Sequence, residues 1–126
     1  MIALRHITLD CEDAATLAAF WSAALERPVD EGASAFFASI GIATRSRRPA
    51  WLFLQVPEGK QAKNRMHLDF SAADPGSDLS ALVDRLVALG ATAHGEHDEW
   101  GTRWTVLADP EGNEFCVGAP SATQVG

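Results

Sequence analysis

Apolar and polar side chains alternate along residues 4–11, and this alternation predicts a β-strand. Ile7 and Leu9 fall on one face of that strand, and His6 falls on the other. We expect the apolar face to lie under a following helix, so that the histidine points away from it.

A helix is expected directly after this strand, because apolar residues recur at helical spacing from residue 14 to residue 25. Asp13 is in position to cap its N-terminus, and Pro28 cannot continue it. Beyond the helix, two shorter strands and a polar linker are predicted at residues 35–42, 50–56 and 57–64.

The second half of the chain repeats this order. Residues 66–71 alternate as a strand, with His67 on one face, and a helix with one apolar side follows and ends at Gly90. A turn is predicted at 74–76 between them, and strands at 92–97, 102–108 and 114–117 come after the helix, with a turn at 109–113.

The chain is therefore predicted to be a β-α-β-β-β unit written twice. The openings His6-Ile-Thr-Leu-Asp and His67-Leu-Asp-Phe-Ser also match in sequence, 61 residues apart. Two copies of such a unit usually share one core. We predict an α+β fold forming a single domain over 1–126, with module one at 1–60, module two at 64–118 and a loose tail at 119–126. Helices on one side and histidines on the other predict a concave, partly polar pocket.

Composition and charge narrow the class of protein. The chain is 47% apolar and 21% charged, as in ordinary globular domains, and its net charge of −7 argues against a nucleic-acid partner. No segment resembles a signal peptide or is long enough to span a membrane. Cys11 and Cys116 do not form a disulfide framework, so we expect a cytoplasmic protein.

Positive charge is concentrated in one part of the chain. Six basic residues lie between Arg45 and Arg65, and only Glu58 opposes them. They belong either to solvated loops or to a rim that attracts anions beside the pocket.

Several segments together resemble the vicinal oxygen chelate superfamily, and most of all its glyoxalase-like domain branch. They are His6-Ile-Thr-Leu, Phe20-Trp21, His67-Leu-Asp-Phe, Leu89-Gly90-Ala91 and Asp109-Pro-Glu-Gly-Asn. The superfamily includes glyoxalase I, fosfomycin-resistance enzymes, extradiol dioxygenases and bleomycin-resistance proteins. The resemblance implies two paired βαβββ modules whose mixed sheet curls into a cup, with the helices outside and a small molecule bound within.

Metal-dependent members of the superfamily place a histidine on the first strand of each module and a glutamate on the last strand. The resemblance puts His6 and His67 at the histidine positions, but Cys116 at the glutamate position and Phe53 at its counterpart in module one. A neutral thiol is a poor ligand. We therefore expect that His6, His67 and Cys116 do not hold a metal tightly. The alternative is that they bind a divalent ion, namely zinc, nickel, manganese or iron. The two histidines are otherwise hydrogen-bonded pocket residues.

Two carboxylates are candidates for acid–base chemistry. Glu114 lies two residues before Cys116, on the same strand face but about 7 Å further along. Asp69 shares a face with His67, where it either acts as a base, binds a cationic ligand or forms a surface ion pair.

Aromatic residues predict the wall of the pocket. Trp51 and Phe53 share a strand face with Gln55, and if Leu52 and Leu54 pack under the helix, the aromatic face lines the cup. A dimer interface or ordinary core is the alternative for this pair. Trp104 is expected to close one end of the pocket.

Two classes of function follow. The first is a binding protein that sequesters a small molecule, as bleomycin-resistance proteins do. The second is a metal-dependent lyase, isomerase or ring-cleaving dioxygenase. Exposed sheet edges and a concave apolar face also predict a homodimer.

Overall fold

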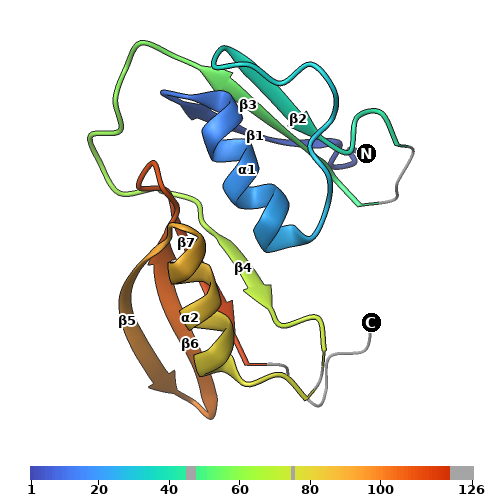
Figure 1. Cartoon of the computed structure of the whole chain (residues 1–126). Coiled ribbons are helices and arrows are strands. Elements are labelled where there is room, and N and C mark those ends of the chain that lie inside the picture. Colours follow the sequence, from blue (N-terminus) through green and yellow to red (C-terminus); the bar gives the residue numbers. More distant parts are fainter. Residues whose placement is uncertain (45–47, 75, 120–126) are drawn as a thin grey trace. The chain divides into compact units, whose positions relative to one another are not determined.

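The computed structural model describes residues 1–44, 48–74 and 76–119, which form two compact units, Met1–Gln61 and Ala62–Gly126. Each unit has one helix against one face of a small mixed sheet (Figure 1). The α+β fold of paired βαβββ modules predicted from the sequence is confirmed. The predicted tail lies outside the described residues except for Ala119, as does Pro75 in the predicted turn at 74–76.

Unit 1 contains three strands and a helix: β1 (His6–Cys11), α1 (Ala14–Leu25), β2 (Phe37–Ile40) and β3 (Ala50–Gln55). The strand order is β1-β3-β2, with β1 parallel and β2 antiparallel to β3. A single β-bridge between Val29 and Ile40 extends the sheet beyond β2. This bridge stands where a fourth strand would complete the module.

The ends of α1 have local causes. The Asp13 side chain accepts a hydrogen bond from the Thr16 N–H at the first turn, as the sequence predicts. At the other end Glu26 adopts a left-handed conformation, with φ of 55°, and its N–H donates to the Ser22 carbonyl. Pro28, two residues after Glu26, cannot continue the helix.

The core of unit 1 lies between α1 and the sheet. The Trp21 ring of α1 lies 4.8 Å from that of Trp51 on β3, and Phe53 is fully buried. Ile7 and Leu9 pair in parallel register with these two residues and so share their face, as expected under the helix.

The condition under which Trp51 and Phe53 would line the cup is therefore not met. Leu52 and Leu54 lie on the face opposite the helix, and Leu54 is 36% exposed. Trp51 and Phe53 are core residues of unit 1, which corresponds to the alternative that the sequence left open. Trp51 faces the helix because its ring packs against the indole of Trp21. The sequence does not show this, because residues 51–54 are all apolar and no alternation identifies which face of the strand is buried.

Unit 2 consists of β4 (Leu68–Ser71), α2 (Leu79–Leu89), β5 (Thr92–Glu99), β6 (Thr102–Ala108) and β7 (Glu114–Gly118). The order is β4-β7-β6-β5, with β4 parallel to β7 and the other pairs antiparallel. Asp78 caps α2 by accepting from the Ser80 N–H, and Gly90 ends it. On the helix side Phe70 meets Phe115 edge to face, at 6.0 Å between ring centroids.

The turn between β6 and β7 is built around Asp109, which is 2% exposed. Its Oδ1 accepts from the backbone N–H groups of Glu111 and Asn113 at 2.9 and 3.0 Å, and its Oδ2 accepts from the Asn113 amide at 2.9 Å. Gly112 supplies the positive φ of 87° that the turn requires. The Asp109 side chain thus stabilises the turn of the Asp-Pro-Glu-Gly-Asn motif through these hydrogen bonds, and we call this arrangement the Asp109 clasp.

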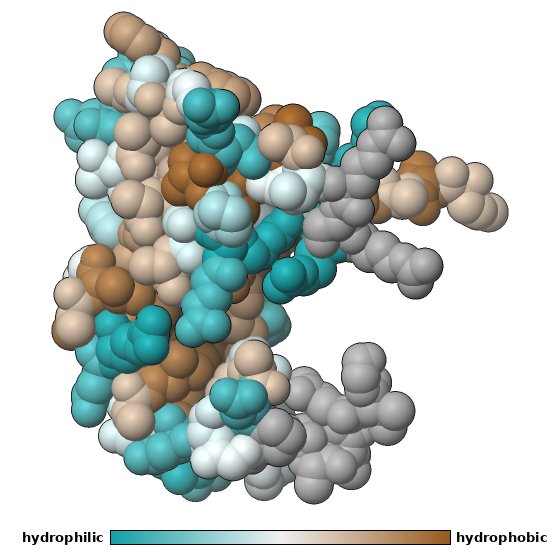
Figure 2. All heavy atoms as spheres, turned by 45° about the vertical axis from the view of Figure 1, so that its right-hand side comes forward, coloured by the Kyte–Doolittle hydropathy of each residue, from teal (hydrophilic) through white to brown (hydrophobic). Residues whose placement is uncertain are grey.

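Large apolar side chains also remain on the surface, and the face in Figure 2 mixes brown hydrophobic with teal hydrophilic side chains. The most exposed are Met1, Ile2, Leu4, Phe36, Met66 and Trp100. No helix among the described residues is long and apolar enough to cross a membrane.

Candidate functional site

The chemistry-bearing side chains of unit 2 lie on the face of its sheet opposite α2, which we call the open face. Alternation and register define it: Asp69 pairs with Cys116, Cys116 with Val106, and Trp104 with both Gly118 and His97. The opposite face carries the buried side chains of Phe115, Val117 and Leu107. A face without a helix leaves these polar groups accessible to a ligand.

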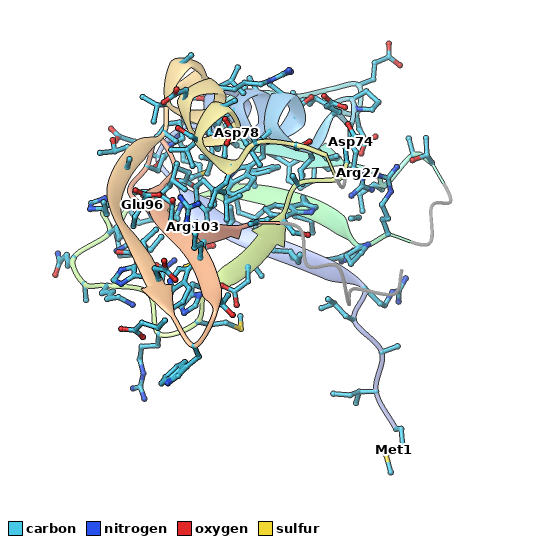
Figure 3. The ribbon with its side chains drawn as sticks, turned by 90° about the horizontal axis from the view of Figure 1, so that it is seen from below. Met1, Arg27, Asp74, Asp78, Glu96 and Arg103 are labelled. Atoms are coloured by element: carbon cyan, nitrogen blue, oxygen red, sulfur yellow. The ribbon has the colours of Figure 1, made fainter. Side chains whose placement is uncertain are left out.

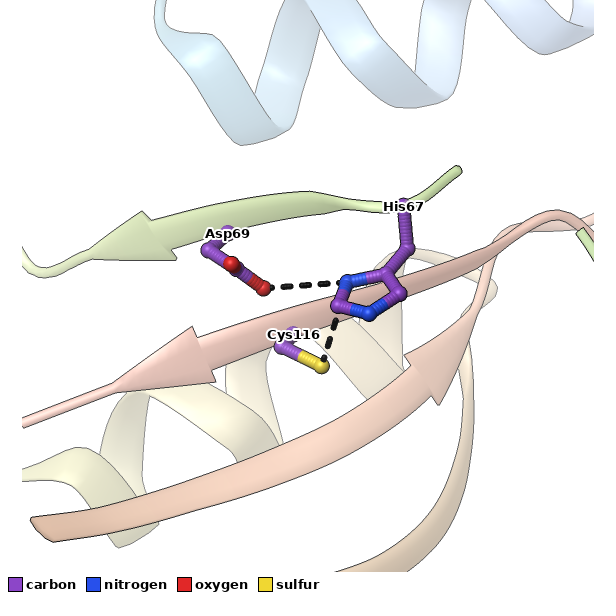
Figure 4. Close-up of side chains that lie close together, drawn as sticks. All are labelled: His67, Asp69 and Cys116. Carbon is purple, nitrogen blue, oxygen red and sulfur yellow. Dashed lines mark hydrogen bonds and ion pairs between the residues drawn. The ribbon is translucent and has the colours of Figure 1, made fainter. Parts of the chain in front are cut away.

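Three side chains of the open face converge on one point (Figure 4). The His67 Nδ1 lies 3.1 Å from Asp69 Oδ1 and 3.9 Å from Cys116 Sγ. One donor atom from each residue lies within 4.8 Å of the other two. Cys116 is buried, whereas the side chains of His67 and Asp69 are 42% and 72% exposed.

The electrostatics of this cluster keep the cysteine protonated. Burial raises the pKa of the Cys116 thiol, and the charge of Asp69 and its hydrogen bond with the thiol raise that pKa further, against a smaller opposing effect of Lys63. Asp69 and Cys116 also face the same imidazole nitrogen. In a cysteine–histidine relay the imidazole is the base: the thiol bonds to one ring nitrogen, and an orienting group bonds to the other. The geometry therefore does not form such a relay.

The same three residues offer a nitrogen, an oxygen and a sulfur donor, a set that zinc and other borderline ions accept. Their spacing fits a small divalent ion, but the thiol would have to lose its proton on binding. Asp69 is thus the third potential ligand beside His67 and Cys116, whereas the sequence predicts His6 as the third residue of this set. His6 lies on β1 of unit 1, and its part in a metal site remains a prediction.

Glu114 is engaged in holding the chain. Its Oε2 accepts from the Asn64 backbone N–H at 3.0 Å. In the amide orientation that satisfies both groups, the Asn64 side chain also donates to Oε2 at 3.2 Å and accepts from the Glu114 N–H at 3.3 Å. These bonds tie the segment before β4 to the start of β7. The acid–base role predicted for Glu114 remains untested.

The predicted pocket residues divide between the two units. Trp51 and Phe53 are buried beside α1, and the Gln55 amide donates to the Glu12 carbonyl at 3.0 Å. Trp104 lies on the open face, where its ring stacks on His97 at 5.2 Å between centroids and 17° between planes.

Sequence reasoning missed His97. The signal was available, because a tight turn at Trp100 and Gly101 makes residues 97 and 104 a cross-strand pair. Of the basic residues in the 45–65 window, Arg48, Lys60, Lys63 and Arg65 are exposed, and Arg45 and Arg47 lie outside the described residues.

A buried arginine was also missed. Arg27, labelled in Figure 3, is 8% exposed and its Nη1 donates to the Pro49 carbonyl at 2.8 Å. Its Nη2 is buried and has no hydrogen-bond partner among the described residues. A Cβ at Gly41 would overlap this guanidinium. Arg27 is therefore enclosed, and it joins the end of α1 to the start of β3.

Residues 6–118 match the family model of the glyoxalase-like domain, and the chain belongs to that family. No curated protein matches the chain. Many solved structures share the fold.

One similar structure is a glyoxalase/bleomycin resistance protein/dioxygenase family enzyme from Burkholderia phytofirmans PsJN. It is 18% identical, with a TM-score of 0.74 over 94% of this chain and 98% of the other. The fosfomycin resistance protein FosX from Listeria monocytogenes is 18% identical, with a TM-score of 0.71 over 97% and 96%. A lactoylglutathione lyase from Agrobacterium tumefaciens is 18% identical, with a TM-score of 0.62 over 94% of each chain. At these identities the likeness extends to the fold alone.

Proposed function

We propose that the protein binds a small organic molecule on the open face of unit 2 and sequesters it without a resident metal. The observation that carries this proposal is the convergence of His67, Asp69 and the neutral thiol of Cys116 on a sheet face that no helix of unit 2 covers. The indole of Trp104 adds an aromatic surface to the same face. A few polar groups beside an aromatic ring are typical of small-molecule sites.

Binding is favoured over catalysis because each catalytic role has an obstacle. Cys116 is held as a thiol, so it is a weak nucleophile. Asp69 is paired with His67, and Glu114 is bonded to Asn64. The resistance proteins named among the similar structures support a binding or detoxifying role, although their fold alone does not transfer their activity.

A ligand screen with two matched tryptophan variants tests this proposal. The full chain is screened against a small-molecule library by thermal shift, and hits are measured by calorimetry. We expect affinity to fall about tenfold or more in Trp104→Leu, because ring stacking is lost. Trp100→Asn is the control, since Trp100 is 94% exposed at the tip of the β5–β6 hairpin. Hits that bind Trp104→Leu and Asp69→Asn as tightly as the wild type would overturn the proposal.

The second candidate is a metal-dependent lyase, isomerase or ring-cleaving dioxygenase. The observation in its favour is the spacing of the three donor atoms, all within 4.8 Å. His67, Asp69 and Cys116 would hold the ion, which when bound polarises substrate oxygens as a Lewis acid. Zinc, nickel, manganese and iron are the ions to consider.

Metal analysis separates the two candidates. Untagged protein is assayed for bound metal as purified and after zinc addition and dialysis, with His67→Ala and Asp69→Asn beside the control His97→Ala. Near-stoichiometric metal that is lost in the first two variants and kept in the control would put the enzyme first. We expect less than about one metal in ten chains, because the thiol must be deprotonated to bind.

Assembly and location are part of the same proposal. We expect a homodimer, which sedimentation at micromolar concentration would reveal, since sheet edges of this kind are usually covered by a partner. Both cysteines, Cys11 and Cys116, are free, which supports a reducing cytoplasm.

A further inference from the structure

The backbone conformation at Gly118 of β7 does not require a glycine. Its φ is not positive, and a Cβ built there would meet only ordinary contacts, at 3.5 Å from the Arg103 carbonyl, 3.9 Å from the Phe70 carbonyl and 4.0 Å from the Trp104 Cβ. Glycine weakens a strand, so a strand glycine without such a need often marks the close approach of a ligand.

The effect of this glycine is that its strand position places no side chain beside the Trp104 indole. Gly118 lies on the open face between its cross-strand partners, Trp104 on β6 and Ser71 on β4. His97 stacks on Trp104 from the β5 side. Because the rings are nearly parallel and stand on neighbouring strands, the other face of the indole is directed over β7, where Gly118 has no side chain. Among the described strand residues, the position beside Trp104 thus combines an indole ring with a backbone that carries no side chain.

The charges around this position favour a cation. The strand residues of the open face include the acids Asp69, Glu99 and Glu114 and no lysine or arginine. Arg103 of β6 lies on the opposite face and pairs with Glu96 at 3.2 Å (Figure 3). Lys63, before β4, offsets part of this charge near Cys116. Asp69 is two residues from Ser71, about 7 Å along β4, and is within reach of a ring substituent.

We propose that a flat, positively charged ring of the ligand stacks on Trp104 over Gly118, with its charged group directed to Asp69. An indole face attracts a cation through its quadrupole, and a carboxylate adds an ionic contact. This inference rests on the proposed function and specifies its ligand class as a cationic heteroaromatic compound.

Three probes that share one ring test the charge preference. 4-Aminoquinoline, quinoline and quinoline-4-carboxylate carry a positive, neutral and negative charge at neutral pH, and their binding to the full chain is measured by calorimetry or ligand-observed NMR. We expect the cation to bind about tenfold more tightly than the neutral ring, and the anion most weakly. Asp69→Asn should reduce the advantage of the cation.

Substitution of the glycine tests the stacking site. Gly118→Leu covers the indole face and should weaken 4-aminoquinoline about tenfold. Thr92→Leu, an exposed residue at the far end of β5, is the matched control and should bind normally. Gly118→Ala, whose Cβ the structure accommodates, should weaken binding less and serves if the leucine variant unfolds.

The outcomes distinguish this inference from the proposed function. Equal binding of the three probes, no binding of any probe, or normal binding by Gly118→Leu would overturn the cationic stacking site. The library screen with Trp104→Leu can still succeed in each of those cases, and the open face would then bind a ligand of another class. Failure of that screen would remove both proposals.

Discussion

The two units share a strand order but differ in what their helix-free faces carry. The offset of 61 residues and the strand register match His67 with His6, Asp69 with Thr8, and Cys116 with Leu52. Phe53, which the family resemblance puts at the counterpart of Cys116, lies one residue further along β3 and on its other face. Where unit 2 gathers a carboxylate and a thiol beside its histidine, unit 1 offers a hydroxyl and a leucine.

The next row along the strands makes the contrast sharper. Phe37 pairs with Leu54 in unit 1, and Trp104 pairs with Gly118 at the equivalent place in unit 2. The aromatic residue in unit 1 thus has a leucine beside it, and the one in unit 2 has an empty position. The two copies of the module therefore carry different side chains at equivalent positions of the face opposite their helix.

The two units also differ in what holds the connection before their last strand, which is Asp109 in unit 2 and Arg27 in unit 1. Removing the Asp109 side chain should have the largest effect on stability. Asp109→Ala leaves the partly buried N–H groups of Glu111 and Asn113 without their acceptor. We expect a loss of roughly 2–4 kcal/mol in the free energy of unfolding, measured in urea. Asp109→Asn keeps one acceptor oxygen and should lose about half as much. A loss below about 1 kcal/mol in the alanine variant would contradict the clasp.

In unit 1 the corresponding connection is held by Arg27 under Gly41. Gly41→Ala should cost roughly 2–3 kcal/mol, because its φ of 83° disfavours a side chain and a Cβ would displace the guanidinium. Gly32→Ala is the matched control: its φ is 93°, but nothing lies within 4 Å of the added Cβ, so it should cost only roughly 1–2 kcal/mol. Equal losses would show that Arg27 contributes nothing.

Removing the side chain at Leu54 and adding one at Gly118 should change the stability of the protein in opposite directions. Leu54→Gly should destabilise the protein by about 1 kcal/mol, since it removes apolar contact with Phe37 and loosens the strand. Gly118→Ala should stabilise it by a few tenths of a kcal/mol to about 1 kcal/mol. Thermal unfolding of both variants beside the wild type measures the pair. Destabilisation by Gly118→Ala would indicate that the glycine serves the fold after all.

The sequence predicted the elements well wherever the period was clear. The strand at 102–108 and the helix from Leu79 to the cap at Gly90 are found at the predicted positions. The buried face of β3 could not be predicted, because residues 51–54 are all apolar. Pairing with β1 shows that Trp51 and Phe53 share the face of Ile7 and Leu9.

The candidate site was predictable only in part, for the same reason. His67 and Asp69 share a face of one predicted strand, and the family resemblance points to Cys116 on another, so each could be named from the sequence. Their convergence on one imidazole nitrogen depends on the register between β4 and β7, and the roles of His97 and Gly118 depend on the registers of β5 and β7 with β6. These pairings join distant segments, and a single sequence does not specify them.

The smallest expected effect concerns an aspartate in unit 1. Asp30 Oδ2 accepts from the Ser39 hydroxyl at 2.7 Å and from the Ile42 N–H at 2.9 Å. Burial by itself would raise the pKa of Asp30, but hydrogen bonds from Ser39 and from the backbone of residues 41–43 outweigh it and lower that pKa below its ordinary value of 3.8.

A pKa lowered by folding means that ionised Asp30 stabilises unit 1 above its unfolded pKa, and that this contribution is lost as pH falls through the folded value. Asp30→Asn should therefore be less stable than the wild type near neutral pH, and the difference should shrink below about pH 4. Urea unfolding of both proteins across that range measures it, with exposed Glu31→Gln as the control. A stability difference that stays constant with pH would mean that the hydrogen bonds, and not the charge they stabilise, account for the role of Asp30.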